Sequence, residues 1–127
     1  MDESEKESLV QQYVRAYNEF DNDGMVALMH PECKFQNVSS GEVNASTTGA
    51  QQFRELAEKS KNLFSSRRQT IRSYRYDGES LTIEIDYEAG LKADIPNGPK
   101  AGETLKLKGK SEFQFRDGLI YALTDYS

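Results

Sequence analysis

The chain has 127 residues, one cysteine, one histidine and a formal net charge of -5 at pH 7. This length fits a single domain with one core. The acidic balance argues against nucleic acid or an anionic membrane as the main partner, because both are bound through clustered Lys and Arg. One His and one Cys are too few for a zinc or iron site, and we expect no other cofactor. The N-terminus has no apolar leader and no apolar run is long enough to cross a membrane, so we expect a cytoplasmic protein with no membrane partner.

Two amphipathic helices are predicted at the start of the chain. The first runs from about Glu5 to Phe20, because apolar residues recur there at three- and four-residue steps. The members of this stripe are Leu9, Tyr13, Ala16, Tyr17 and Phe20. Asn22 or Asp23 can cap the second helix, and Pro31 should end it. Two stripe residues are tyrosines, whose buried hydroxyls need partners, so the first helix is a candidate wall of a ligand cavity.

A short strand, a polar loop and a third helix should follow. The strand is expected over residues 33–37, and the loop over 38–48 is rich in Ser, Asn, Thr and Gly. Thr48 can cap a third helix from about Gly49 to Phe64. Cys33 lies in the strand with no second histidine near it in sequence, so we expect a buried, inert thiol.

Strict alternation predicts strands in the second half of the chain. Apolar residues occupy every second position from Leu81 and again from Leu105, which gives each run one apolar face. Antiparallel pairing about a centre near Asn97 would place Glu88 by Lys106, Asp86 by Lys108, Glu84 by Lys110, Ile85 by Gly109, Tyr87 by Leu107 and Ile83 by Ser111. Each such pair contributes about 0.2–1 kcal/mol, and a one-residue slip would exchange the two faces. We therefore interpret the lysines as ladder partners and not as a phosphate site.

Turn signals complete the order of elements. Residues 77–78 and 116–118 should turn the chain between strands, with flanking strands from Arg67 to Tyr76 and from Leu119 to Tyr126. Residues 96–99, with two prolines around Asn-Gly, predict a protruding loop. The order is helix, helix, strand, helix and then four strands. Helices ahead of a strand meander indicate an α+β domain with the helices on one face of a curved antiparallel sheet.

This order resembles the nuclear transport factor 2-like superfamily, which includes ketosteroid isomerases, polyketide cyclases of the SnoaL type and limonene epoxide hydrolases. Three segments carry the resemblance: VQQYVRAYNEFDNDGMVALMHP, the helix start from Gly49 to Leu56, and SEFQFRDGLIYAL. The resemblance implies one SnoaL-like domain over residues 1–127. Its fold would be a cone of three N-terminal helices packed on a curved antiparallel sheet, around a mostly apolar cavity. It also implies a homodimer through the convex sheet face.

The isomerase site is only partly present by this resemblance. Tyr13 falls where the isomerases keep an oxyanion-hole tyrosine. Asn37 falls at or beside the catalytic Asp, and an amide cannot accept and return a proton as a carboxylate does. Ser111 falls at the second oxyanion donor, a protonated Asp in the isomerases. The resemblance therefore does not imply steroid isomerisation.

The cyclases need an acid inside the cavity, and the candidates here are Asp125, His30 and Glu42. Asp125 shares strand parity with Leu119, Tyr121 and Leu123, so its direction depends on which parity faces the cavity. A purely structural interpretation of His30 is a residue at the end of a helix, where its cation favours the negative end of the helix dipole. Glu42 fits a solvated loop better than a cavity. No constellation matches the Asp-Arg-Asp site of the epoxide hydrolases.

Three hypotheses about function remain open. The first is a small soluble domain that holds an apolar or aromatic small molecule and need not catalyse a reaction. Its candidate ligand-binding residues are Tyr13, Tyr17, Asn37, Tyr87, Ser111 and Phe113. The second is a cyclase-like or isomerase-like enzyme that uses Asp125 or His30 as acid or base. The third is a homodimeric protein-interaction module that works through the convex face.

Overall fold

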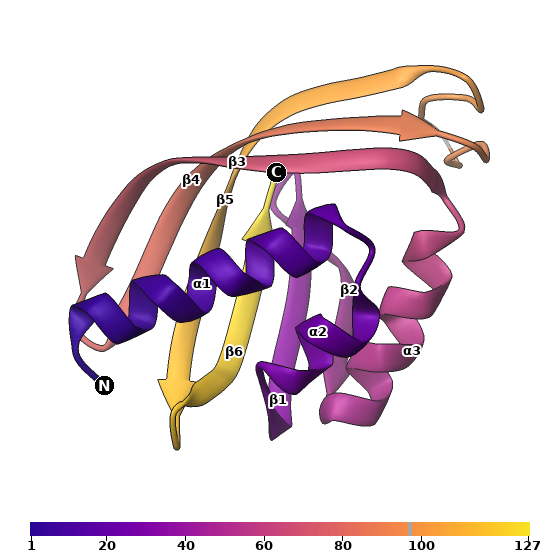
Figure 1. Cartoon of the computed structure of the whole chain (residues 1–127). Coiled ribbons are helices and arrows are strands. Elements are labelled where there is room, and N and C mark those ends of the chain that lie inside the picture. Colours follow the sequence, from indigo (N-terminus) through magenta and orange to yellow (C-terminus); the bar gives the residue numbers. More distant parts are fainter. Residues whose placement is uncertain (97) are drawn as a thin grey trace.

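Three helices lie on one face of a six-stranded curved sheet in the computed structural model, which describes residues 1–96 and 98–127 (Figure 1). The elements are α1 (Glu3–Asn18), α2 (Asn22–Ala27), β1 (Met29–Ser39), β2 (Glu42–Thr48), α3 (Ala50–Lys61), β3 (Phe64–Asp77), β4 (Ser80–Leu91), β5 (Thr104–Arg116) and β6 (Leu119–Tyr126). Helices followed by a long meander confirm the predicted α+β cone. Asn97, taken above as the centre of the β4–β5 connection, lies outside the described residues.

The helix boundaries differ from the predicted ones because of particular caps. Helix α1 starts at Glu3, since Asp2 accepts from the Glu5 backbone N–H at 2.8 Å and the Glu5 carboxylate accepts from the Asp2 N–H at 3.2 Å. It ends at Asn18, and Phe20 beyond it has a left-handed φ of 57°. Asp21, and neither of the two residues after it, caps α2.

Strand β2 is an addition to the predicted elements, because residues 42–48 were expected to be loop. Ser40 and Gly41 both have positive φ, 52° and 81°, which fits a tight two-residue hairpin turn between β1 and β2. The expected cap of α3 was wrong: Gly49 stands at the N-cap position without a side-chain cap. The side chain of Gln52 instead accepts from the Thr48 backbone N–H at 2.9 Å. Pro31 lies inside β1, after α2 has already ended at Ala27.

The strand order in the sheet is β2-β1-β6-β5-β4-β3. All neighbours are antiparallel except β1 and β6, which run parallel and depart from the expected pairing. The predicted β4–β5 register is confirmed in all six residue pairs, so the charged side chains lie on the outer face and the apolar ones face the helices. That register fixes which side chains reach the space under the helices.

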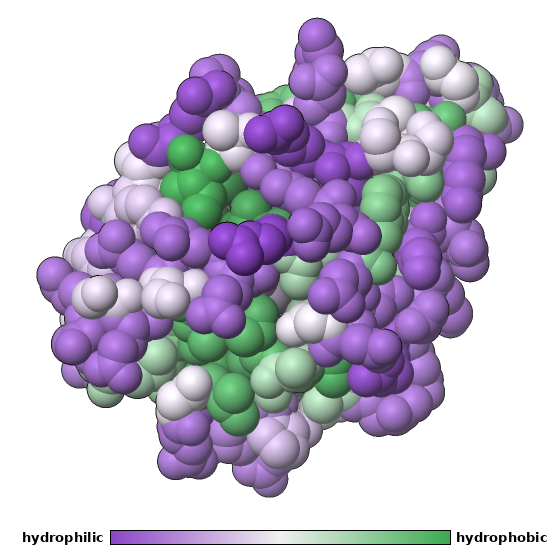
Figure 2. Space-filling model, in the orientation of Figure 1, coloured by the Kyte–Doolittle hydropathy of each residue, from purple (hydrophilic) through white to green (hydrophobic). Residues whose placement is uncertain are grey.

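The core lies between the three helices and the inner face of the sheet. Val10, Leu81, Ile83 and Ile120 are 0% exposed there, and Phe113 and Leu123 join them. On the surface in view, apolar residues gather in patches framed by hydrophilic ones (Figure 2). Across the described residues, none of the helices has both the length and the apolar character needed to cross a membrane.

Candidate ligand cavity

A cavity of about 390 Å³ lies between the inner face of the sheet and helices α1 and α3. Apolar and aromatic side chains make most of its wall, among them Tyr17, Phe35, Leu56, Tyr87 and Leu107. A smaller cavity of about 60 Å³ shares several wall residues with it. A mostly apolar cavity of this size with a few polar groups is typical of small-molecule sites.

Asp125 is the one acidic side chain in the wall of the larger cavity among the described residues. Its Oδ1 accepts a hydrogen bond of 2.6 Å from the Ser111 hydroxyl, and Ser111 is 1% exposed. Burial raises the pKa of the Asp125 carboxyl to about 6, and the hydrogen bond from Ser111 opposes that rise. The carboxyl therefore changes its protonation state near neutral pH, as an acid or base of a reaction would have to.

The sheet register places Asp125 in a row with two other polar residues. Asp125 lies opposite Asn37 of β1 on one side and opposite Ser111 of β5 on the other. The three side chains all line the cavity, which settles the parity of β6: Asp125 faces inward with Leu123. Asn37 is held by its neighbour on β2, since its Nδ2 donates to Asn44 Oδ1 at 2.8 Å. Two of these groups donate or accept hydrogen bonds, and the third can also take up a proton.

A pair of tyrosines forms a second polar feature of the same wall. The hydroxyl oxygens of Tyr17 on α1 and Tyr87 on β4 are 2.8 Å apart. Burial raises the pKa of both phenols, so both are protonated at neutral pH. Tyr87 also packs edge-on against Phe64, with 6.5 Å between ring centroids. The pair thus offers protons to hydrogen-bond acceptors inside the cavity.

Arg67 also lines the cavity, although the sequence analysis named it only as the first residue of a predicted strand. It is 5% exposed, and its Nε donates to the Tyr17 carbonyl oxygen at 2.8 Å. Its guanidinium lies 3.8 Å from the centroid of the Tyr17 ring and 4.4 Å from that of Phe20. The missed signal was parity: Arg67 and Gln69 alternate with exposed residues on β3, and both are buried.

Tyr13 and Phe113 lie deeper than predicted for ligand contacts. Phe113 is 1% exposed and is not part of the larger cavity's wall, while Tyr13 is 4% exposed and reaches only the smaller cavity. Their rings pack edge-on with centroids 5.9 Å apart. Burial, with a smaller effect of Asp125, raises the pKa of Tyr13 far above its usual range, so this phenol stays protonated.

His30 is placed away from the cavity. Its Nε2 lies 3.2 Å from Asp117 Oδ2, and its Nδ1 accepts from the Glu32 backbone N–H at 3.0 Å. Its ring packs edge-on against Tyr121, 5.4 Å between centroids. Glu42 is exposed at the start of β2. Of the three acid candidates, the structure brings only Asp125 to the cavity wall.

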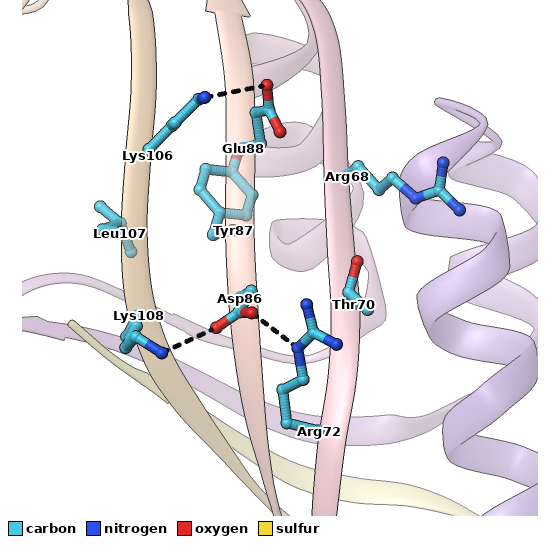
Figure 3. A pocket seen from close by; sticks show the side chains of 9 residues that line it. All are labelled: Arg68, Thr70, Arg72, Asp86, Tyr87, Glu88, Lys106, Leu107 and Lys108. Carbon is cyan, nitrogen blue, oxygen red and sulfur yellow. Dashed lines mark hydrogen bonds and ion pairs between the residues drawn. The ribbon is translucent and has the colours of Figure 1, made fainter.

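A second hollow, of about 400 Å³, lies over the charged side chains of β3, β4 and β5 (Figure 3). Five of its six charged side chains form ion pairs: Arg72 Nε is 2.6 Å from Asp86 Oδ2, Lys108 Nζ is 3.5 Å from Asp86 Oδ1, and Lys106 Nζ is 4.0 Å from Glu88 Oε1. The two lysine pairs belong to the predicted ladder, whereas the Arg72–Asp86 pair was not predicted. The homodimer expected on this face stays a prediction.

The profile of the SnoaL-like domain matches residues 10–123. The chain belongs to the SnoaL-like domain family. No curated protein matches the chain. Within residues 1–96 and 98–127, no group of three His, Cys, Asp or Glu side chains could hold a metal ion.

Solved structures show the same fold as this SnoaL-like protein. A proposed polyketide cyclase from Xanthomonas campestris pv. campestris has a TM-score of 0.79 and 23% identity, over 98% of this chain and 90% of that one. A ketosteroid isomerase-like fold protein from Catenulispora acidiphila, in complex with trimethylamine, has a TM-score of 0.77 and 18% identity, over 94% and 84%. TerC, co-crystallised with polyporic acid, has a TM-score of 0.76 and 15% identity, over 95% and 89%.

Proposed function

We propose that this SnoaL-like protein binds an apolar or aromatic small molecule in the cavity of about 390 Å³. The observation that carries the proposal is the composition of the wall. Aromatic and aliphatic side chains surround most of the space. The polar groups come from the row of Asn37, Ser111 and Asp125, from the hydroxyls of the tyrosine pair and from Arg67. Such a wall favours an apolar body by burial and orients it through a few hydrogen bonds. Two solved relatives of the same fold were crystallised with small organic molecules, which supports this use of the fold.

Titration by NMR with 2-naphthamide tests the proposal, because this neutral aromatic molecule can be followed residue by residue. Ser60→Phe would fill the cavity from α3, since Ser60 lines both the larger and the smaller space. Ser8→Phe is the matched control, because Ser8 is an exposed serine within α1. We expect binding to wild type and to the control, with shifts at cavity residues, and loss of binding to the Ser60 variant. Unchanged binding to the Ser60 variant would place the ligand elsewhere and remove the proposal.

A second candidate function is proton transfer within the bound molecule, with Asp125 as acid or base. The observation that favours it is a lone cavity carboxyl whose pKa is about 6, held by the Ser111 hydroxyl. The base would remove a proton next to a carbonyl group and could return it to another atom. Exchange of solvent deuterium into 1-tetralone, followed by NMR, tests this step. Wild type should exceed Asp125→Asn, and equal rates would remove proton abstraction from such ketones.

A further inference from the structure

Arg67 is a buried cation that no acidic side chain of the described residues neutralises. Among the described residues, Nε is the one guanidinium donor with a hydrogen-bond partner, which is the Tyr17 carbonyl oxygen. Its Nη2 is buried and has no hydrogen-bond partner within residues 1–96 and 98–127. An unpaired buried charge is costly, so buried guanidinium groups are normally met by carboxylates or other acceptors. The stacked rings of Tyr17 and Phe20 attract the cation but accept no hydrogen bond in the guanidinium plane.

The tyrosine pair beside Arg67 has a spare proton. Only one hydroxyl hydrogen can lie between the oxygens of Tyr17 and Tyr87, which are 2.8 Å apart, so the other is free to donate to a third group. The positive charge of Arg67 lowers the pKa of both phenols, against the stronger raising effect of burial. A phenol beside a cation is a stronger donor to an anionic oxygen than an isolated phenol would be. All three side chains line the same cavity.

Backbone contacts hold this group in place. The Asn18 side chain donates to the Gln69 carbonyl oxygen at 3.1 Å and accepts from the Gln69 N–H at 2.7 Å, which ties the end of α1 to β3. Phe20 takes a left-handed φ, a strained conformation for a bulky residue, and its ring lies over Arg67. The donors are therefore positioned before any ligand arrives, which reduces the ordering cost of binding.

We propose that Arg67 and the Tyr17–Tyr87 pair bind an oxyanion of the ligand, so that the ligand is an aromatic acid carrying a carboxylate or phenolate. This inference rests on the proposed function of the cavity and names the chemical class of its ligand. The oxyanion would receive hydrogen bonds from the free phenol and from the guanidinium, and it would neutralise the buried charge. Asp125 lines the same cavity, where its carboxyl accepts the hydrogen bond from the Ser111 hydroxyl.

Calorimetric titration with 2-naphthoate and 2-naphthamide tests the proposal, because the two probes have nearly the same shape and differ in charge. Hydrogen bonds to charged groups predict that wild type prefers the acid by about 10- to 100-fold. Arg67→Met should abolish that preference. Tyr17→Phe and Tyr87→Phe, which keep the rings, should each reduce it about 3- to 10-fold. The Tyr variants keep the proposal testable even if the arginine variant does not fold.

Another arginine stacked on a tyrosine, outside the cavity wall, provides matched controls. Arg116 lies 3.8 Å from the centroid of the Tyr121 ring, the same stacking distance as Arg67 on Tyr17, but outside the cavity wall. Arg116→Met and Tyr121→Phe should leave the preference for the acid unchanged. Equal affinity of wild type for acid and amide would overturn the oxyanion site while the cavity function stands. The oxyanion site would also be overturned if the preference for the acid survived both in Arg67→Met and in the variant that combines Tyr17→Phe with Tyr87→Phe. Binding of neither probe would remove both proposals.

Discussion

Asp125→Asn should stabilise the protein at about pH 8 and lose that advantage on acidification. The rise of the Asp125 pKa from 3.8 to about 6, at about 1.36 kcal/mol for each pKa unit, corresponds to about 3 kcal/mol. Above pH 6 this carboxyl is ionised in both states, and its burial costs the folded state that amount. Asparagine carries no charge and can still accept the hydrogen bond from Ser111. The variant should therefore unfold with a free energy about 3 kcal/mol higher than wild type.

The sign of the pH dependence follows from where each state takes up the proton. As pH falls, folded wild type binds a proton near pH 6, while the unfolded chain binds one only near the usual 3.8. The folded state therefore gains stability from Asp125 as pH falls through this window. The advantage of Asp125→Asn should shrink steadily over the same range and be close to zero at about pH 4. Comparing variant with wild type cancels the contributions of the other carboxyl groups.

Urea unfolding followed by far-ultraviolet circular dichroism measures this difference, since the chain has no tryptophan to report by fluorescence. Ser111→Ala provides an internal check. This substitution removes the hydroxyl whose hydrogen bond lowers the pKa of Asp125, so the carboxyl should titrate above pH 6 in that variant. A difference between Asp125→Asn and wild type that is the same at pH 4 and pH 8 would refute the reasoning.

Three further predictions concern packing. Phe113→Ala should lower the free energy of unfolding by about 3–5 kcal/mol in urea, because Phe113 is 1% exposed against Tyr13; a loss under about 1 kcal/mol would contradict that core role. Gly109→Ala should cost about 1–3 kcal/mol, because its Cβ would lie 2.7 Å from the Tyr126 carbonyl oxygen, and an unchanged melting temperature would count against this clash. Cys33 is 0% exposed and burial raises its thiol pKa, so thiol reagents should label it only on unfolding; rapid labelling of native protein is the contrary result.

The sequence predicted the fold best where the alternation of apolar and charged residues was strict. In β4 and β5, alternating charges and apolar residues leave one register that pairs Glu88 with Lys106, and that register is confirmed. Strand β2 was missed because its residues are mostly polar and its turn, Ser40-Gly41, is a weaker hairpin signal than Asn-Gly. The parallel pairing of β1 with β6 was missed because no local pattern links residues so far apart.

The sequence also predicted one part of the candidate site and missed another. Tyr17, Asn37, Tyr87, Ser111 and Asp125 were singled out, and all five line the cavity, although their roles stay predictions. Arg67 was overlooked because arginine is normally a surface residue and here follows two serines and precedes another arginine. Its burial depends on the end of α1 reaching β3, which is a tertiary contact that sequence periodicity does not encode.

The position of β6 sets an order of events during folding. This strand, the last element of the sheet along the chain, follows β5 through the turn Asp117-Gly118, so local pairing can form two units, the β1–β2 hairpin and the β3–β6 meander. Until the two units pair through β1 and β6, both of these strands have an unpaired edge. Pairing over such a sequence separation is slow, because much of the chain must be ordered before the contact is gained. Nascent or partly unfolded protein should therefore expose the edges of β1 and β6 as a route to aggregation.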